Sequence, residues 1–182
     1  MKAFTLAEVI VVIALMTILM LVGAGIYLSN NQFYRTTSGE IQAINATRSA
    51  ADRVNEFARG AASGVASYTY NSVVYTAGSD IMILKVPSID ASRNIINGSY
   101  DYVVFGRDPG NSSRLILLTD AASGSARPER LLQITDKLSA ISITWDNVDL
   151  ALAKNVSYSI TVSETGPNPA SEQIYGSATL RN

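Results

Sequence analysis

The chain has 182 residues, with 14 Lys and Arg against 15 Asp and Glu, and a formal net charge of −1. Its basic residues are scattered rather than gathered in the stripe that binding to nucleic acid requires, and its length suits one ordinary domain after an apolar N-terminal run. Cys and His are both absent, which excludes disulfides, metal sites built on either residue, and His-based catalytic triads.

An apolar run over residues 9–28 is the first predicted element. A bilayer core takes about 20 apolar residues as a helix, so the run predicts a membrane-spanning or filament-core helix over residues 4–28. Gly23 and Gly25 interrupt the run, and each weakens a helix by about 1 kcal/mol relative to Ala. Two interpretations of these glycines stay open: local flexibility of the helix, or close packing between helices through small residues.

Glu8 is a carboxylate at the front of this run, and the next charged residue is Arg35. Thr5 and Glu8 have the spacing of a capping box, in which each side chain satisfies a backbone donor at the start of a helix. That motif alone predicts only that a helix begins at Thr5. An ionisable group in a membrane span is, in addition, a candidate functional group.

The apolar run continues as an amphipathic segment over residues 29–64, so that one long helix is predicted from Phe4 to about Ala62. Apolar residues recur there at spacings of three and four, which predicts that the helix packs against a sheet. Gly60, Ser63 and Gly64 mark its end. The apolar positions of this stripe are Ile41, Ile44, Ala51, Val54, Phe57, Ala58, Ala61 and Val65.

Short strands separated by turns are predicted over residues 65–182, which form a β-rich head. Pro87 is expected to stop a strand, and residues 88–98 are expected to form a loop. Residues 131–138 fit either a strand or a short helical piece. The strands are expected at residues 68–76, 81–86, 100–105, 115–119, 141–145, 156–162 and 174–180.

A tight turn at Asp108-Pro109-Gly110-Asn111 joins two of these strands in a predicted hairpin. The fold class that follows is α+β. A long N-terminal helix packs against an antiparallel β-sheet head of one or two sheets. The aspartates at positions 80, 90, 101, 108 and 120 have oxygens suited to Ca²⁺, but they stand beside turn residues, and turn chemistry is the favoured role for them.

The combination of Ala3, Phe4, Thr5 and Glu8 with the apolar span resembles the N-terminus of type IV pilins and of type II secretion pseudopilins. The resemblance implies a leader peptide at residues 1–3, cleavage by prepilin peptidase between Ala3 and Phe4, and N-methylation of Phe4. Glu8 would then pair with the N-terminal amine of a neighbouring subunit during assembly. The family usually has Gly where this chain has Ala3.

The head resembles minor pilins and J-type pseudopilins in the sequence Tyr100-Asp101-Tyr102 before a hairpin and in the ending Leu180-Arg181-Asn182. Both resemblances imply a structural subunit of a type IV pilus-like filament. The sequence contains no Ser nucleophile elbow, P-loop or dinucleotide fingerprint, so the protein is not expected to be an enzyme, and no cofactor or metal is expected. The implied partners are other pilin or pseudopilin subunits, the prepilin peptidase, an inner-membrane assembly platform and, before assembly, membrane lipid.

The implied location is a single pass through the cytoplasmic membrane with the N-terminus in the cytoplasm and the head outside. The subunit then enters an extracellular or periplasmic filament. One alternative is a major pilin or an adhesive surface subunit. A second is a bitopic, membrane-anchored β domain unrelated to pili. A conventional signal peptide is disfavoured, because such peptides have an apolar region of only about 7–15 residues. The apolar run of this chain, over residues 9–28, is longer.

Overall fold

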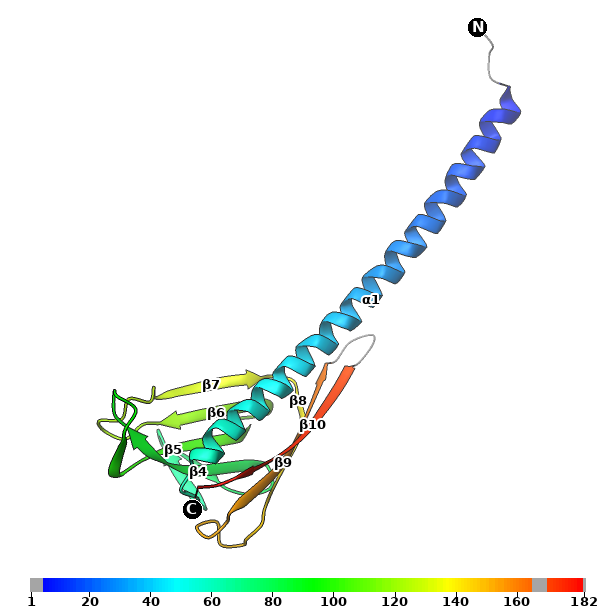
Figure 1. Cartoon of the computed structure of the whole chain (residues 1–182). Helices are drawn as coiled ribbons and strands as arrows, with labels where there is room; N and C mark the ends of the chain where they lie inside the picture. The colour runs from blue at the N-terminus through cyan, green and yellow to red at the C-terminus, as the bar shows by residue number, and fades with distance from the viewer. Residues whose placement is uncertain (1–4, 165–169, 182) are drawn as a thin grey trace. The chain divides into compact units, whose positions relative to one another are not determined.

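The computed structural model describes residues 5–164 and 170–181, so that Ala3 and Phe4 lie outside the described residues. One long helix is followed by β-strands, as expected for an α+β fold (Figure 1). The chain divides into two compact units, Met1–Gly39 and Glu40–Asn182. The elements are α1 (Leu6–Gly60), β1 (Ser63–Gly64), β2 (Ser67–Tyr70), β3 (Val73–Thr76), β4 (Ile81–Ile89), β5 (Ile95–Asp108), β6 (Asn111–Asp120), β7 (Arg130–Thr135), β8 (Leu138–Trp145), β9 (Asn155–Glu164) and β10 (Ala170–Thr179).

The second unit contains two main antiparallel sheets within the described part of the chain (Figure 1). The larger is five-stranded, with the order β1-β4-β5-β6-β7, and the smaller is three-stranded, with the order β10-β9-β8. Strands β4 to β7 are joined as consecutive hairpins, and so are β8 to β10. A separate two-stranded hairpin, β2-β3, completes the set.

The last turns of α1 pack against both sheets in a single apolar core. Alanines dominate the helix side of this core, and their small side chains allow the sheets to approach the helix closely. Burial of each large aliphatic partner contributes about 1.5–3 kcal/mol. Members of this core are Ala50, Val54 and Ala58 of α1, Leu84, Phe105 and Leu117 of the five-stranded sheet, and Val156, Ile160 and Val162 of the three-stranded sheet.

The buried stripe of α1 differs from the predicted one at its N-terminal end. Ile41 is 53 % exposed, so its assignment to the stripe was wrong, whereas Ala43, Thr47 and Ala50 are buried. Thr47 is tolerated in this position because its hydroxyl donates to the Ala43 carbonyl at 2.9 Å. A search for large apolar residues misses this stripe, because it consists of alanines and of a threonine whose hydroxyl donates to a carbonyl of its own helix.

Pro87 does not stop its strand, since β4 continues to Ile89 and β5 already begins at Ile95. The loop expected over residues 88–98 is therefore wrong, and only residues 90–94 connect the two strands. Pro87 is paired with Tyr100, and the register shifts between Pro87 and Ile89. The Pro87 carbonyl accepts a hydrogen bond from Arg127 on the edge away from β5. The missing N–H of Pro87 faces that same edge, so the ladder with β5 loses no bond.

Two other local predictions have clear outcomes. The hairpin turn at 108–111 is confirmed, because β5 ends at Asp108 and β6 begins at Asn111. The ambiguous segment 131–138 is extended: it contains most of β7 and reaches the first residue of β8.

Gly106 occupies a position in β5 that no other residue could take without displacement of the backbone. Its φ is +152°, and a Cβ on this residue would lie 2.3 Å from the Asp80 carbonyl oxygen. The close approach lets the Arg107 N–H donate to that same carbonyl at 2.9 Å. Glycine therefore fixes the start of β4 against the end of β5.

The outer face of the five-stranded sheet is covered by the β2-β3 hairpin. Tyr75 is buried there with Ile83 and Val104. Tyr68 stacks on Tyr102 with ring centroids 4.4 Å apart, and its hydroxyl donates to Asp120. Burial and this acidic acceptor raise the pKa of Tyr68. Tyr68, Tyr75 and Tyr102 thus pack the β2-β3 hairpin against the five-stranded sheet.

Tyr158 joins the three-stranded sheet to the helix. Its ring is buried, and its hydroxyl lies 3.3 Å from both the Ala51 carbonyl oxygen and Asn55 Oδ1. We expect Tyr158→Phe to lower the free energy of unfolding by about 0.5–1.5 kcal/mol, because the hydrogen bond is lost while the ring packing remains. Urea unfolding of the detergent-solubilised full chain, followed by Trp145 fluorescence, measures this loss.

Tyr175→Phe is the matched control, because Tyr175 is 74 % exposed on the neighbouring strand. Its effect should stay within about 0.5 kcal/mol. Equal losses in the two variants would contradict the role given to the Tyr158 hydroxyl.

Candidate functional site at the start of α1

Thr5 and Glu8 form the hydrogen bonds of a capping box. The Thr5 N–H donates to Glu8 Oε2 at 2.9 Å, and the Thr5 hydroxyl donates to the same oxygen at 3.0 Å. In return the Glu8 N–H lies 3.4 Å from Thr5 Oγ1. Helix α1 accordingly begins at Leu6, and Glu8 is an acid in its first turn, where the helix dipole favours negative charge.

Glu8 uses only one of its two carboxylate oxygens in these bonds. Within residues 5–164 and 170–181, no hydrogen bond reaches Oε1, and no ion pair involves Glu8. A carboxylate has about four acceptor sites, so the group retains capacity for a cationic donor from outside the described chain. The capping role and a further pairing role are therefore compatible in one side chain.

The helix around Glu8 is apolar and uncovered. Leu6–Arg35 is the one stretch of the described chain that is long and apolar enough to cross a membrane by length and composition, and the mean hydropathy of its most apolar 18-residue window is 2.9. None of its most apolar window is buried against the rest of the protein. Most of its large apolar side chains, including Leu19 and Leu21, are more than half exposed. An apolar surface of this extent requires lipid or other helices as its environment.

Gly23 and Gly25 lie within this uncovered stretch, and α1 continues through both without a break. A Cβ on either glycine would meet no atom within 4 Å. Packing against the described residues therefore requires neither glycine. Thr17, the other interruption, donates its hydroxyl to the Ile13 carbonyl at 2.8 Å and so leaves no unsatisfied polar group.

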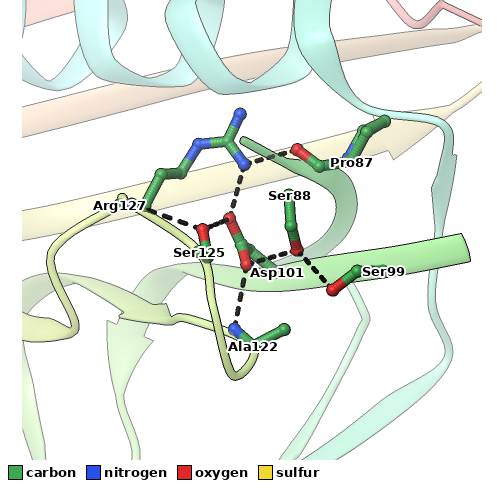
Figure 2. Close-up of polar contacts among 7 residues, drawn as sticks. All are labelled: Pro87, Ser88, Ser99, Asp101, Ala122, Ser125 and Arg127. Atoms are coloured by element: carbon green, nitrogen blue, oxygen red, sulfur yellow. Dashed lines mark hydrogen bonds and ion pairs between the residues drawn. The ribbon is translucent and has the colours of Figure 1, made fainter. Parts of the chain in front are cut away.

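A second polar centre, not anticipated from the sequence, lies in the head (Figure 2). Asp101 is fully buried in the middle of β5, on the same face as Val103 and Phe105. Its carboxylate accepts hydrogen bonds from Ser88 at 2.7 Å and from the Ala122 N–H at 2.9 Å. The expected turn role is therefore wrong for Asp101.

Arg127 and Ser125 complete the shell of Asp101. Arg127 Nη1 lies 2.6 Å from Asp101 Oδ2, and the Ser125 hydroxyl donates to that oxygen at 2.8 Å (Figure 2). Burial by itself raises the pKa of Asp101, but the hydrogen bonds donated to the carboxylate outweigh it and hold the pKa below its usual value. The ionised Asp101 thus ties the loop between β6 and β7 to β4 and β5.

Two of the other candidate aspartates, Asp90 and Asp108, have the predicted turn role. Asp90 caps the β4-β5 turn by accepting the Ser92 and Asn94 N–H groups, both at 2.8 Å. Asp108 accepts the Gly110 N–H at 2.9 Å. Within the described residues, no three acidic side chains gather in a group that could hold a metal ion. The one signal in the sequence that could have indicated a buried role for Asp101 is its position as a charged residue within a predicted apolar strand.

Comparison with protein families, curated proteins and solved structures found no match to this chain. The site therefore has to be interpreted from its own geometry. That geometry is an acid with a spare oxygen at the first turn of an uncovered apolar helix, followed by an α+β head.

Proposed function

We propose that the chain is a structural subunit, a minor pilin or pseudopilin, of a type IV pilus-like filament. The observation that carries the proposal is Glu8: a carboxylate with one free oxygen at the start of an apolar helix that nothing in the described chain covers. An acid that served only as a cap would be equally suited to a helix in water. The pilin resemblance, by contrast, explains why Glu8 stands at the start of an apolar helix of this length.

In this proposal the precursor is held in the cytoplasmic membrane by Leu6–Arg35, with the head outside. Prepilin peptidase cuts between Ala3 and Phe4 and leaves a methylated Phe4 amine. The helix then leaves the lipid for a bundle of neighbouring helices, where Glu8 meets the amine of the adjacent subunit. A buried carboxylate is tolerated when an opposite charge meets it, so this pairing also fixes the register of the helices.

The first test is the intact mass of the chain produced with and without an active prepilin peptidase. We expect the active enzyme to remove residues 1–3 and to add one methyl group to Phe4. Co-expression with a catalytically inactive peptidase is the control and should leave the mass unchanged. A chain that keeps Met1 with the active enzyme, or is cut near Gly25, would contradict the proposal and favour an anchored or secreted β domain.

A further inference from the structure

A cleft of about 550 Å³ lies between the last turns of α1, the β4-β5 turn and the loop before β7. Arg53, Arg93, Arg127 and Arg130 all line it. They come from three separate parts of the chain, so the fold rather than the local sequence brings them together. The cleft borders the Asp101 centre, and Arg127 belongs to both (Figure 2).

The four arginines differ in how they are neutralised. Arg127 is paired with Asp101, and Arg53 is paired with Glu56 at 3.1 Å. Arg93 and Arg130 form no ion pair with any residue that the structure describes. Since Glu56 and Asp90 are the acids among the lining residues, the cleft carries an excess of positive charge.

The backbone at Arg93 is held in a left-handed conformation with φ at +66°. This conformation costs a residue with a Cβ about 1–2 kcal/mol, and Gly or Asn would adopt it more easily. The Asp90 carboxylate maintains it by accepting the flanking Ser92 and Asn94 N–H groups. This turn places Arg93 among the residues that line the cleft.

Part of the lining is apolar. Phe57, Ile89 and Pro128 contribute to it, together with Ala91 and Ala126. These side chains give a ligand an apolar surface beside the guanidinium groups. The cleft therefore combines unpaired cationic donors with a surface for a small hydrocarbon group.

We infer that this cleft is a binding site for a small organic anion that presents carboxylate or phosphate oxygens next to an apolar group. The Arg93 and Arg130 side chains supply charge-assisted hydrogen bonds to the oxygens, since a guanidinium matches both oxyanions in geometry. Phe57 and Pro128 contact the apolar part. Arg127 contributes positive potential but remains engaged by Asp101. This site is independent of the filament proposal, because it needs neither processing nor assembly.

The test is calorimetric titration of the detergent-solubilised full chain with phenyl phosphate and, separately, with benzoate. We expect saturable binding of at least one probe with a Kd below about 1 mM, and preference between the probes identifies the oxyanion. Inorganic phosphate should bind more weakly than phenyl phosphate, because it lacks the apolar group. No saturable binding of either aromatic probe would overturn the inference.

The variant R93Q/R130Q removes both unpaired charges from exposed side chains, and it should weaken binding at least about tenfold. R181Q is the matched control, because Arg181 is exposed and lies outside the cleft lining. It should leave the Kd unchanged. An equal loss in R181Q would show non-specific attraction to net charge and would also overturn the site. Unfolding curves of the variants verify that the head is intact.

Discussion

Glu8→Gln is expected to lower incorporation of the subunit into filaments by a factor of about 150–4,000, while the protein still accumulates in the membrane. The reason is that the amide keeps an oxygen for the Thr5 hydrogen bonds but removes the charge that, in the proposed filament, would meet a neighbouring amine. Loss of one partner of a buried ion pair costs about 3–5 kcal/mol, which corresponds to this range of equilibrium constants. The measurement is the amount of the chain in purified filaments relative to its amount in membranes.

Thr5→Ala is the matched control for Glu8→Gln. It removes the side chain that donates to Glu8 Oε2 and leaves the carboxylate charged. Loss of a cap costs about 0.5–2 kcal/mol, so this variant should assemble far better than Glu8→Gln. If both variants assembled equally well, or failed equally, Glu8 would be only a cap and the assembly mechanism would be wrong.

Asp101→Asn is expected to destabilise the head by about 3–5 kcal/mol, because Arg127 then faces a neutral group in a buried pair. The loss is a large part of the 5–15 kcal/mol that is typical of a folded protein. Urea unfolding of the full chain, followed by the fluorescence of its single Trp, Trp145, measures the change. Asp52→Asn on the exposed face of α1 is the control and should change stability by less than about 0.5 kcal/mol.

The Asp101 effect should also depend on pH with a defined sign. The pKa of Asp101 is lower in the folded protein than its ordinary value of about 3.9. Its stabilisation is therefore complete above that value and disappears as the pH falls through the lower, folded pKa. The gap between wild type and Asp101→Asn should be constant from about pH 7 to 5 and should shrink as the pH falls below about 3.9 and through the lower, folded pKa. A gap that did not shrink down to the lowest pH at which the head stays folded would mean that shape, rather than charge, makes Asp101 important.

The sequence predicted the α+β class because the apolar span, the helix end and the turn at Asp108 are all local signals. Pro87 shows where local signals fail. Whether a proline ends a strand depends on which edge its nitrogen faces, and this is set by the pairing of β4 with β5. The Pro87 carbonyl then accepts a hydrogen bond from Arg127, which lies 40 residues away in the chain. The loop containing Arg127 acts as a partner for the exposed edge of β4, with the Ala126 N–H donating to Ile89 at 2.7 Å.

Asp101 and the arginine cleft were missed for a related reason. Asp101 stands between two tyrosines, and its partners come from positions 88, 122, 125 and 127. Only the pairing of β4, β5 and β6 brings these groups together. Glu8 could be singled out from the sequence because both its capping partner and its apolar surroundings are local. Its role in assembly remains a prediction.

The order of the hairpins has a consequence for how the head reaches its native state. In β4 to β7 and in β8 to β10, each strand pairs with its neighbour in the chain, so most strand contacts close short loops. Such contacts form quickly because little chain entropy is lost. Other contacts are long-range, among them the bond from Tyr158 to Ala51 across 107 residues and the bond from the Gly64 N–H to the Leu150 carbonyl. We therefore expect docking of the two sheets onto α1 to be the slow, non-local step in folding of the head.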